Sequence, residues 1–550
     1  MRPQHAFFCA MLGAATLPTP VAASTSHADD IGWRACDPEE TGWNAPALKA
    51  RLQCGTMRVP LDHSHPAEGE VDVGLIRVLA GDPLRRMGSV FFNFGGPGGN
   101  PRRFLPVMAD WWNTLEASDP VAGSLRTLAD RYDLVAVVPR GLAGGRVYDC
   151  LAGRTAGPFN DLSVDASDAN WAAATHDAVA LAGDCGMDPF SPWVNTAQHV
   201  HDMEFARRLF GDAPLNFYGT SYGTWVGAWY AATYPDHVGR MLFDSTMDVT
   251  RYFHDAVYTQ VMDVHELFLA DAVGPALAAP ETYGLGSDEA VLLQRVRTMP
   301  ARAHERWLRT IGGPADLAAA VTLADWLGVD SRVDQATLGR RIASHAFSPD
   351  PDTNARIREA AGHLLSAYFS ELPSAVDALL GTDGRSVHLA VVCNDTPWIR
   401  EAAYWRAFAR HMAAAYPGGS SNEAHLGLTC ANWPGRDNVR PDMSRLGSIP
   451  DFLMIQAEFD PATSLANARR VLATYDNAHM VLARGLHGHG ILNPSAPACV
   501  LSAAAGYLLD GRVPKAKLTS CEPSSAPIPR SLDTPTRLID AQLKRLFKAS

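Results

Sequence analysis

Short apolar runs alternate with segments of helical spacing through the first half of the chain. The predicted strands are 71–79, 89–94, 132–138, 215–219 and 240–244. Apart from Asp133, the run 132–138 is apolar, as expected for a strand buried on both faces of a parallel sheet. Helical spacing at 199–210 and 225–234 separates the later strands. This alternation of strand and helix predicts a doubly wound α/β domain.

The pattern changes between about 247 and 446, where helical stretches rich in Ala and Leu replace the strands. The clearest of these stretches are 254–272, 317–327 and 357–369. The α/β character then returns, with strands at 451–457 and 479–482 and a helix at 499–509. We therefore predict a helical cap inserted into one α/β core. The alternative is a separate helical domain with no role at the functional site.

The N-terminus has the pattern of a secretory signal peptide. Arg2 precedes an apolar run, 6–17, and the small residues Val21-Ala22-Ala23 offer a cleavage site. The run is too short to span a bilayer comfortably, although a buried first helix or a retained anchor would share its composition. No later segment has an apolar run of spanning length. We expect export to a periplasm or to the medium.

Four segments follow from these patterns. They are a signal peptide at 1–23, the first part of the core at 24–246, the cap at 247–446 and the second part of the core at 447–550. A chain of 550 residues is too long for one compact core, which agrees with an insertion. The formal charge of −12 and the lack of a basic stripe argue against nucleic-acid binding.

The cysteines also indicate export. Cys9 lies in the predicted signal, so eight of the nine cysteines remain, an even number suited to an oxidising compartment. Eight cysteines allow 105 pairings, and we predict the pairing between sequence neighbours. The predicted disulfides are Cys36–Cys54, Cys150–Cys185, Cys393–Cys430 and Cys499–Cys521. No CxxC occurs, and His63-Ser64-His65 is typical of a loop, so neither a metal site nor a cofactor is predicted.

The strongest chemical motif is Gly219-Thr220-Ser221-Tyr222-Gly223, a G-x-S-x-G sequence between a predicted strand and a predicted helix. A strand that turns sharply into a helix lifts the serine hydroxyl clear of the sheet. Glycines on either side remove side chains that would clash in that turn. The motif predicts a nucleophile elbow in an α/β-hydrolase fold, with Ser221 as the nucleophile.

A serine nucleophile needs a base and an orienting carboxylate, which in this fold follow in the order Ser, acid, His. Asp460 comes just after the strand 451–457, and His489 lies between glycines after the strand 479–482. We predict these two residues as the acid and the base. Glu458 and His487 are the nearest alternatives.

A glycine-rich run, Gly95-Gly96-Pro97-Gly98-Gly99, follows the strand 89–94. Backbone amides in such a loop can stabilise the oxyanion that forms during acyl transfer. We predict one donor at Gly96 and the other at Tyr222, the residue after the nucleophile. A simple tight turn is the alternative. A phosphate-binding loop is disfavoured because the run lacks the Lys-Ser or Lys-Thr of such loops.

At these motifs the chain resembles the secreted tripeptidyl aminopeptidases of the prolyl aminopeptidase-like serine peptidases, which have a characteristic C-terminal segment. The shared elements span most of the chain. They include Gly95 to Gly99, Pro139-Arg140-Gly141, Gly219 to Gly223, Cys393-Asn394-Asp395, Cys430 with Trp433, Asp460-Pro461, Gly488-His489-Gly490, and Cys499 with Cys521. Two positions depart from the family pattern. Val138 precedes Pro139 where the family often has Asp, and Ser245 replaces a usual Gly.

The resemblance implies a serine exopeptidase that releases short peptides, tripeptides above all, from free N-termini, with the cap closing over the substrate. It also implies Ser221, Asp460 and His489 as the triad. Such an enzyme needs a carboxylate for the substrate ammonium, and Asp395 is the candidate. A secreted esterase or lipase using the same triad is the first alternative, and a non-catalytic binding protein is the second.

Overall fold

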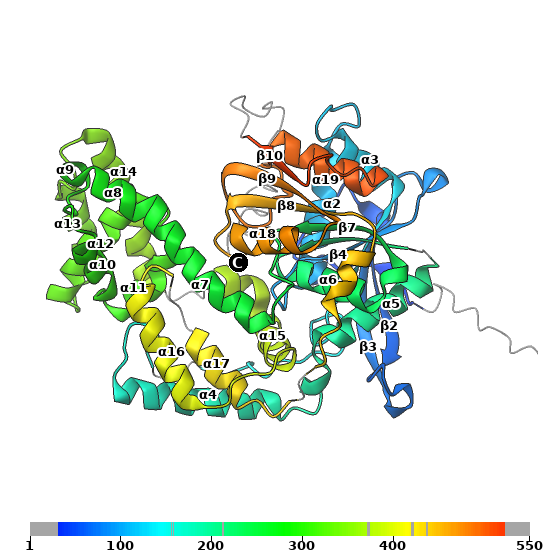
Figure 1. The fold of residues 1–550 in the computed structure, drawn as a ribbon, viewed down its shortest axis with the longest axis horizontal. Helices are drawn as coiled ribbons and strands as arrows, with labels where there is room; N and C mark the ends of the chain where they lie inside the picture. The colour runs from blue at the N-terminus through cyan, green and yellow to red at the C-terminus, as the bar shows by residue number, and fades with distance from the viewer. Residues whose placement is uncertain are drawn as a thin grey trace, which may run out of the picture.

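A ten-stranded sheet runs through the described part of the protein (Figure 1). The computed structural model describes residues 31–522, except 156, 158, 212–213, 371–374, 420–422 and 436–437. The predicted signal peptide, 1–23, lies outside the described residues. The strand order is β1-β2-β3-β5-β4-β6-β7-β8-β9-β10. Strands β1, β2 and β3 pair antiparallel at one end, and the strands from β5 to β10 are parallel.

The strands are β1 (Arg34–Ala35), β2 (Leu52–Pro60), β3 (Glu70–Val78), β4 (Ser89–Asn93), β5 (Asp133–Val137), β6 (Leu215–Thr220), β7 (Val238–Asp244), β8 (Phe452–Phe459), β9 (Ala478–His487) and β10 (Leu518–Cys521). All residues of β4 and β5 are buried. Their apolar sequences therefore fit the centre of a sheet covered on both faces. Each of the predicted strands corresponds to one of these elements.

The helices are α1 (Pro38–Thr41), α2 (Pro101–Thr114), α3 (Gly123–Arg131), α4 (Asp168–Gly186), α5 (Thr196–Phe210), α6 (Tyr222–Thr233), α7 (Phe253–Phe268), α8 (Gly274–Ala278), α9 (Pro280–Tyr283), α10 (Glu289–Arg297), α11 (Ala301–Trp307), α12 (Pro314–Val329), α13 (Gln335–Ser344), α14 (Pro351–Phe369), α15 (Ala375–Asn394), α16 (Ala402–Ala415), α17 (Glu423–Ala431), α18 (Leu465–Thr474) and α19 (Ala498–Asp510). Helices α2, α3 and α19 cover one face of the sheet. Helices α5, α6 and α18 cover the other face.

The segment predicted as a cap, 247–446, contains no strand among its described residues. Helices α8 to α14 share a hydrophobic core of their own, around Trp307 and Leu323, and stand apart from the sheet in Figure 1. Helices α15, α16 and α17 belong instead to the hydrophobic core on the face of the sheet that α5, α6 and α18 cover. Helix α17 packs against α4, which precedes the nucleophile motif in the chain. The helical layer therefore draws on sequence from both sides of Ser221.

Four disulfides join Cys36–Cys54, Cys150–Cys185, Cys393–Cys430 and Cys499–Cys521, the pairs expected between sequence neighbours. The two cysteines of each pair are 18 to 37 positions apart in the sequence. The Cys393–Cys430 bridge ties α15 to α17, and the Cys499–Cys521 bridge ties α19 to the edge strand β10. Within the described residues, no helix is both long enough and apolar enough to cross a membrane.

The Cys393–Cys430 disulfide should stabilise the helices that pack on α4. We expect the double variant Cys393→Ala, Cys430→Ala to lose about 2–5 kcal/mol of unfolding free energy, because the bridge restricts the unfolded chain. Urea unfolding followed by circular dichroism measures this loss. The shorter loop closed by Cys36–Cys54 makes its double Ala variant a control that should lose less. An unchanged unfolding midpoint in the first variant would contradict the expectation.

Candidate active site

Ser221 lies in the sharp turn between β6 and α6 and has a strained backbone, with φ 58° and ψ −126°. A non-glycine residue in such a conformation costs about 1–3 kcal/mol and is found mainly at functional sites. A Cβ on Gly219 would collide with the carbonyl of Gly223, and one on Gly223 would collide with the carbonyl of Asn93. The two motif glycines are therefore required by close backbone contacts.

Hydrogen bonds hold the turn at both ends. The Ser221 amide donates to the carbonyl of Asp244 at the end of β7, at 3.0 Å. The Ser221 carbonyl accepts from the amide and the hydroxyl of Thr224, at 2.8 and 2.7 Å. The strained serine is thus fixed between the sheet and the first turn of α6.

His489 and Asp460 form a buried hydrogen-bonded pair. Nδ1 of His489 lies 2.9 Å from Oδ1 and 3.1 Å from Oδ2 of Asp460. The Asp460 carboxylate also accepts from the amides of Ala462 and Thr463, both at 2.9 Å, and from the Thr463 hydroxyl at 3.1 Å. The loop after β8 therefore satisfies the carboxylate and aims it at one side of the imidazole.

Burial and charge set the pKa values of this pair. Burial alone would lower the pKa of His489, but the Asp460 carboxylate, its hydrogen bond and the charge of Asp244 together raise it above the usual value. Burial alone would raise the pKa of Asp460, but His489 and the backbone amides lower it. Asp460 therefore stays ionised and favours a protonated Nδ1 on His489.

The structure brings Ser221 and His489 onto the same edge of the sheet without a hydrogen bond between them. Nε2 of His489 is buried and has no hydrogen-bond partner among the described residues. Catalytic hydrogen bonds are often long in ligand-free enzymes and shorten when substrate binds. The imidazole thus leaves Nε2 available, on the side opposite the nitrogen that contacts Asp460.

The two alternatives predicted for the acid and the base are engaged elsewhere. The Glu458 carboxylate pairs with Arg484 at 2.6 Å and accepts from the Gly485 amide at 2.8 Å. The His487 side chain is 56% exposed and lies 3.5 Å from Asp271. These contacts favour Asp460 and His489 over Glu458 and His487.

The glycine-rich loop lies directly against the nucleophile turn. A Cβ on Gly95 would come within 3.0 Å of the Ser221 Cβ and 3.2 Å of the Tyr222 amide nitrogen. The Gly99 amide donates to the Gly95 carbonyl at 3.1 Å and closes the loop. A side chain at Gly95, which precedes the predicted oxyanion donor Gly96, would therefore crowd the amide of the other predicted donor, Tyr222.

Two polar residues beneath this loop were not predicted from the sequence. The Asn93 side chain accepts from the Gly95 amide at 3.0 Å and lies 3.1 Å from Nε2 of His199. Burial lowers the pKa of His199 to about 4, so this histidine is neutral at ordinary pH. The only sequence signal was the position of Asn93 at the end of a strand, just before the glycines.

The helical segment contacts each part of the site. Phe253 at the start of α7 packs against Tyr222, with ring centroids 6.1 Å apart. Asp263 of α7 accepts a hydrogen bond from Ser464, in the loop that carries Asp460. His388 of α15 lies 3.3 Å from the carbonyl of Pro97 in the glycine-rich loop. Helices α7 and α15 therefore form part of the surroundings of the candidate site.

Asp395, predicted to bind a substrate amine, is buried at the end of α15. Its Oδ1 accepts from the Thr196 amide at 3.0 Å, and its Oδ2 accepts from the Thr196 hydroxyl, which also contacts the Tyr222 hydroxyl. Asn438 donates to Oδ1 at 3.3 Å. Burial raises the pKa of Asp395 to about 7 despite these donors. The structure thus connects Asp395 through the Thr196 hydroxyl to Tyr222, the residue after the predicted nucleophile.

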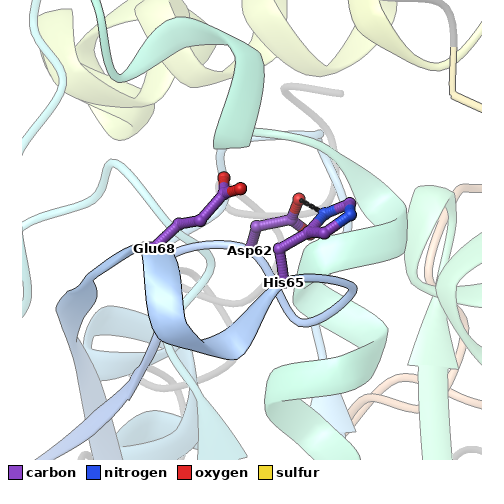
Figure 2. A group of neighbouring side chains, drawn as sticks. All are labelled: Asp62, His65 and Glu68. Carbon is purple, nitrogen blue, oxygen red and sulfur yellow. Dashed lines mark hydrogen bonds and ion pairs between the residues drawn. The ribbon is translucent and has the colours of Figure 1, made fainter.

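Among the residues that the structure describes, one group of possible metal ligands lies in the loop after β2. Figure 2 shows Asp62, His65 and Glu68, whose ligand atoms lie within 4.8 Å of one another. Asp62 already accepts from the Ser64 amide at 2.8 Å and lies 3.0 Å from Nδ1 of His65, while Glu68 is exposed. These contacts are typical of a stabilised loop, and we assign no metal to the group.

Family models match two parts of this chain. The model described as alpha/beta hydrolase fold matches residues 111–272, and the model described as TAP-like protein matches residues 416–521. The chain has an α/β-hydrolase fold, and its carboxy-terminal segment is similar to the TAP-like family. The parallel strands and the turn at Ser221 agree with this assignment and confirm the predicted fold.

Similar proteins extend along most of the chain. The tripeptidyl aminopeptidase of Streptomyces lividans is 26% identical over 525 residues, which cover 92% of this chain and 90% of the relative. The tripeptidyl aminopeptidase of Streptomyces coelicolor has the same identity and covers 92% and 89%. These relatives confirm the resemblance inferred from the motifs.

Solved structures match at low scores. A hydrolase from Pseudomonas aeruginosa has a TM-score of 0.30 and 12% identity and covers 80% of this chain and 95% of its own. An enol-lactonase from Burkholderia xenovorans has a TM-score of 0.28 and 12% identity and covers 80% and 97%.

The raised pKa of His489 predicts how reactivity depends on pH. The imidazole must be neutral to accept a proton, so labelling of Ser221 by a fluorophosphonate should slow as pH falls, with an apparent pKa above about 6.5. In the variant Asp460→Asn, His489 loses a negatively charged neighbour and its pKa should fall. The pH at which the residual labelling is half-maximal should therefore be lower than in the wild type. Labelling rates between pH 5 and 9 measure both values. A wild-type midpoint below the ordinary histidine value of about 6.5 would contradict the argument.

Proposed function

We propose that this protein is an exported serine exopeptidase that releases short peptides, tripeptides above all, from free N-termini. One observation carries the proposal: the buried His489–Asp460 pair stands at the sheet edge that also holds the strained Ser221. The similarity to two tripeptidyl aminopeptidases over 92% of the chain supports the substrate class. The cap contacts described above support a substrate space that the helices enclose.

The proposed reaction proceeds through an acyl-enzyme. His489 accepts the Ser221 proton at Nε2 while Oγ attacks the carbonyl carbon, and Asp460 stabilises the imidazolium through Nδ1. The amides of Gly96 and Tyr222 stabilise the oxyanion. His489 then donates its proton to the leaving amine, and the acyl group remains on Ser221. Water, deprotonated by His489, hydrolyses the ester and releases the short peptide.

Export of the protein is part of the same proposal. Four disulfides favour an oxidising compartment, because cytosolic thiols are kept reduced. The sequence pattern at 1–23 provides a route to a periplasm or to the medium. The four segments predicted from the sequence, including the cap at 247–446, remain our proposal for the domain organisation.

The variant Ser221→Ala tests the nucleophile. We expect it to abolish fluorophosphonate labelling and to lower kcat/KM for a free tripeptidyl anilide by about 10⁴-fold or more, because the acyl-enzyme cannot form. Its thermal unfolding temperature should not fall, since alanine lacks only the hydroxyl. Labelling at full stoichiometry in the variant would refute Ser221 as the nucleophile.

Three substrates separate the peptidase from an esterase. The wild-type protein should hydrolyse a free tripeptidyl anilide much faster than the same anilide with an acetylated amine, because an exopeptidase recognises the ammonium group. A short acyl ester lacks this group and should be a poorer substrate. Equal rates on the free and the acetylated anilide, with fast hydrolysis of the ester, would favour the esterase.

The variant Asp395→Asn tests the proposed amine partner. If its carboxylate holds the ammonium, KM for the free anilide should rise about 10-fold or more, while the acetylated anilide is unaffected. Because the pKa of Asp395 is raised to about 7, the wild-type preference for a free amine should weaken as pH falls through 7 and the carboxylate is protonated.

Asp110→Asn is a matched control for this test. Asp110 is also a buried aspartate with a raised pKa, but it lies on α2 and bonds to Trp43. It should leave the amine preference unchanged. An unaltered ratio of free to acetylated rates in Asp395→Asn would show that Asp395 has only its hydrogen-bonding role at Thr196.

A further inference from the structure

Two adjacent residues at the end of β7 hold the segment that follows His489. Three consecutive backbone amides of that segment, each at 2.9 Å, donate to the side chains of Asp244 and Ser245. The donors are Gly490, to Oγ of Ser245, and Ile491 and Leu492, to the two carboxylate oxygens of Asp244. The Ser245 hydroxyl in turn donates to Oδ1 of Asp244 at 3.3 Å. Each of the residues 490–492, in the loop that follows His489 (the base loop), is therefore hydrogen-bonded to this pair.

The backbone of the same pair contacts the other two parts of the site. The Asp244 carbonyl accepts from the Ser221 amide at 3.0 Å, and the Ser245 amide donates to the carbonyl of Ile455 in β8 at 3.0 Å. Strand β8 leads to Asp460. The dipeptide Asp244-Ser245 thus forms hydrogen bonds to the turn at Ser221, to strand β8 before Asp460 and to the segment after His489.

Ser245 has an unfavourable backbone conformation. Its φ is 58°, and among the described residues only Lys49 and Ser221 are other non-glycine residues with positive φ. Ser245 is fully buried. Glycine adopts this conformation without strain, so the backbone alone would favour glycine here. Compared with glycine, serine adds a hydroxyl, and this hydroxyl accepts a hydrogen bond from the amide of Gly490, the residue after His489.

Asp244 also influences the imidazole by its charge. The carboxylate is fully buried and accepts from the Tyr218 hydroxyl at 2.8 Å. Burial raises the pKa of Asp244 above its usual value, and the backbone amides, Tyr218 and charged His489 offset only part of this increase. The ionised groups that act on His489 are Asp460, from the loop after β8, and Asp244, from the end of β7. The Thr463 hydroxyl, 3.4 Å from Nδ1, is its neutral neighbour.

We propose that Ser245 and Asp244 are positioning residues for His489, which hold the loop 488–492 so that the imidazole can serve Ser221. This inference rests on the proposed function, in which His489 is the base and Ser221 the nucleophile. Displacing a reacting group by about 1 Å can cost on the order of 100-fold in rate, which sets the size of the expected effect.

Ser245→Gly is the decisive variant, because it removes the hydroxyl and relieves the strain together. We expect fluorophosphonate labelling and kcat to fall by about 10- to 100-fold, with KM nearly unchanged and a thermal unfolding temperature that is equal or higher. A purely structural role would make activity and unfolding temperature fall together. Ser245→Ala keeps the strain and loses the bond, so it should lower both.

Lys49→Gly is the matched control, since it relieves strain at an exposed position with φ 45° and touches no part of the site. It should leave labelling unchanged. Wild-type labelling and kcat in Ser245→Gly would overturn the proposal, even while Ser221→Ala remains unlabelled. If the wild-type protein itself does not label at Ser221, the proposed function fails instead.

Asp244→Asn tests the charge. Asparagine keeps the size of the side chain but removes a negative neighbour of His489, so the acid limb of kcat/KM should move to lower pH. The variant's circular dichroism and unfolding curve establish that it is folded. A folded variant with an unchanged acid limb would contradict the electrostatic part of the proposal, and Ser245→Gly tests the geometric part independently.

Discussion

The buried carboxylate of Asp244 constrains the whole catalytic edge of this protein. A charge removed from water is costly unless each oxygen is hydrogen-bonded, and here the donors are a tyrosine hydroxyl, a serine hydroxyl and two backbone amides of the base loop. Moving that loop would leave the carboxylate without its partners. The position of His489 is therefore coupled to the end of β7, and through the Asp244 carbonyl to Ser221.

The parallel sheet explains why residues so distant in sequence meet at this edge. Strands β6, β7, β8 and β9 are neighbours in the sheet and run in the same direction. Their carboxyl ends therefore lie side by side, and the segments after them carry Ser221, Asp460 and His489. The chemistry needs only short loops from these strand ends. The long helical insertion could be accommodated between β7 and β8 because it leaves the strand order intact.

The sequence predicted the parts of the site that depend on local backbone geometry. The turn at Ser221 requires glycines at 219 and 223, and the loop beside it is rich in glycine. Both features are therefore recognisable as glycine patterns in the sequence. The chain order of the three residues proposed as nucleophile, acid and base, Ser221, Asp460 and His489, also follows from the sequence. The disulfides could be predicted because each joins two cysteines that are consecutive in the sequence.

Other features depend on tertiary contacts that no local pattern encodes. Nothing in the sequence around Asn93 indicates that His199 lies beneath it, and nothing around Asp244 indicates that its oxygens bind amides near residue 490. The packing of α4 on α17 was equally hidden, because an apolar helical face does not specify which helix covers it. Asp395 illustrates the same limit: the sequence offered an acid, but only the structure shows that Thr196 and Asn438 already bind it.

Strain at two serines connects these observations. Ser221 and Ser245 both have φ 58°, and each such conformation costs about 1–3 kcal/mol. The two serines lie close together at the ends of β6 and β7, since the Ser221 amide donates a hydrogen bond to the carbonyl of Asp244, the residue before Ser245. The surrounding hydrogen bonds must outweigh both costs. At Ser221 the strain lies at the proposed nucleophile, and at Ser245 it accompanies a hydroxyl that binds the amide of Gly490, next to His489. The strained backbone conformations therefore occur at the two serines whose side-chain oxygens have to be held in place. The parallel strands that precede these serines hold them in position.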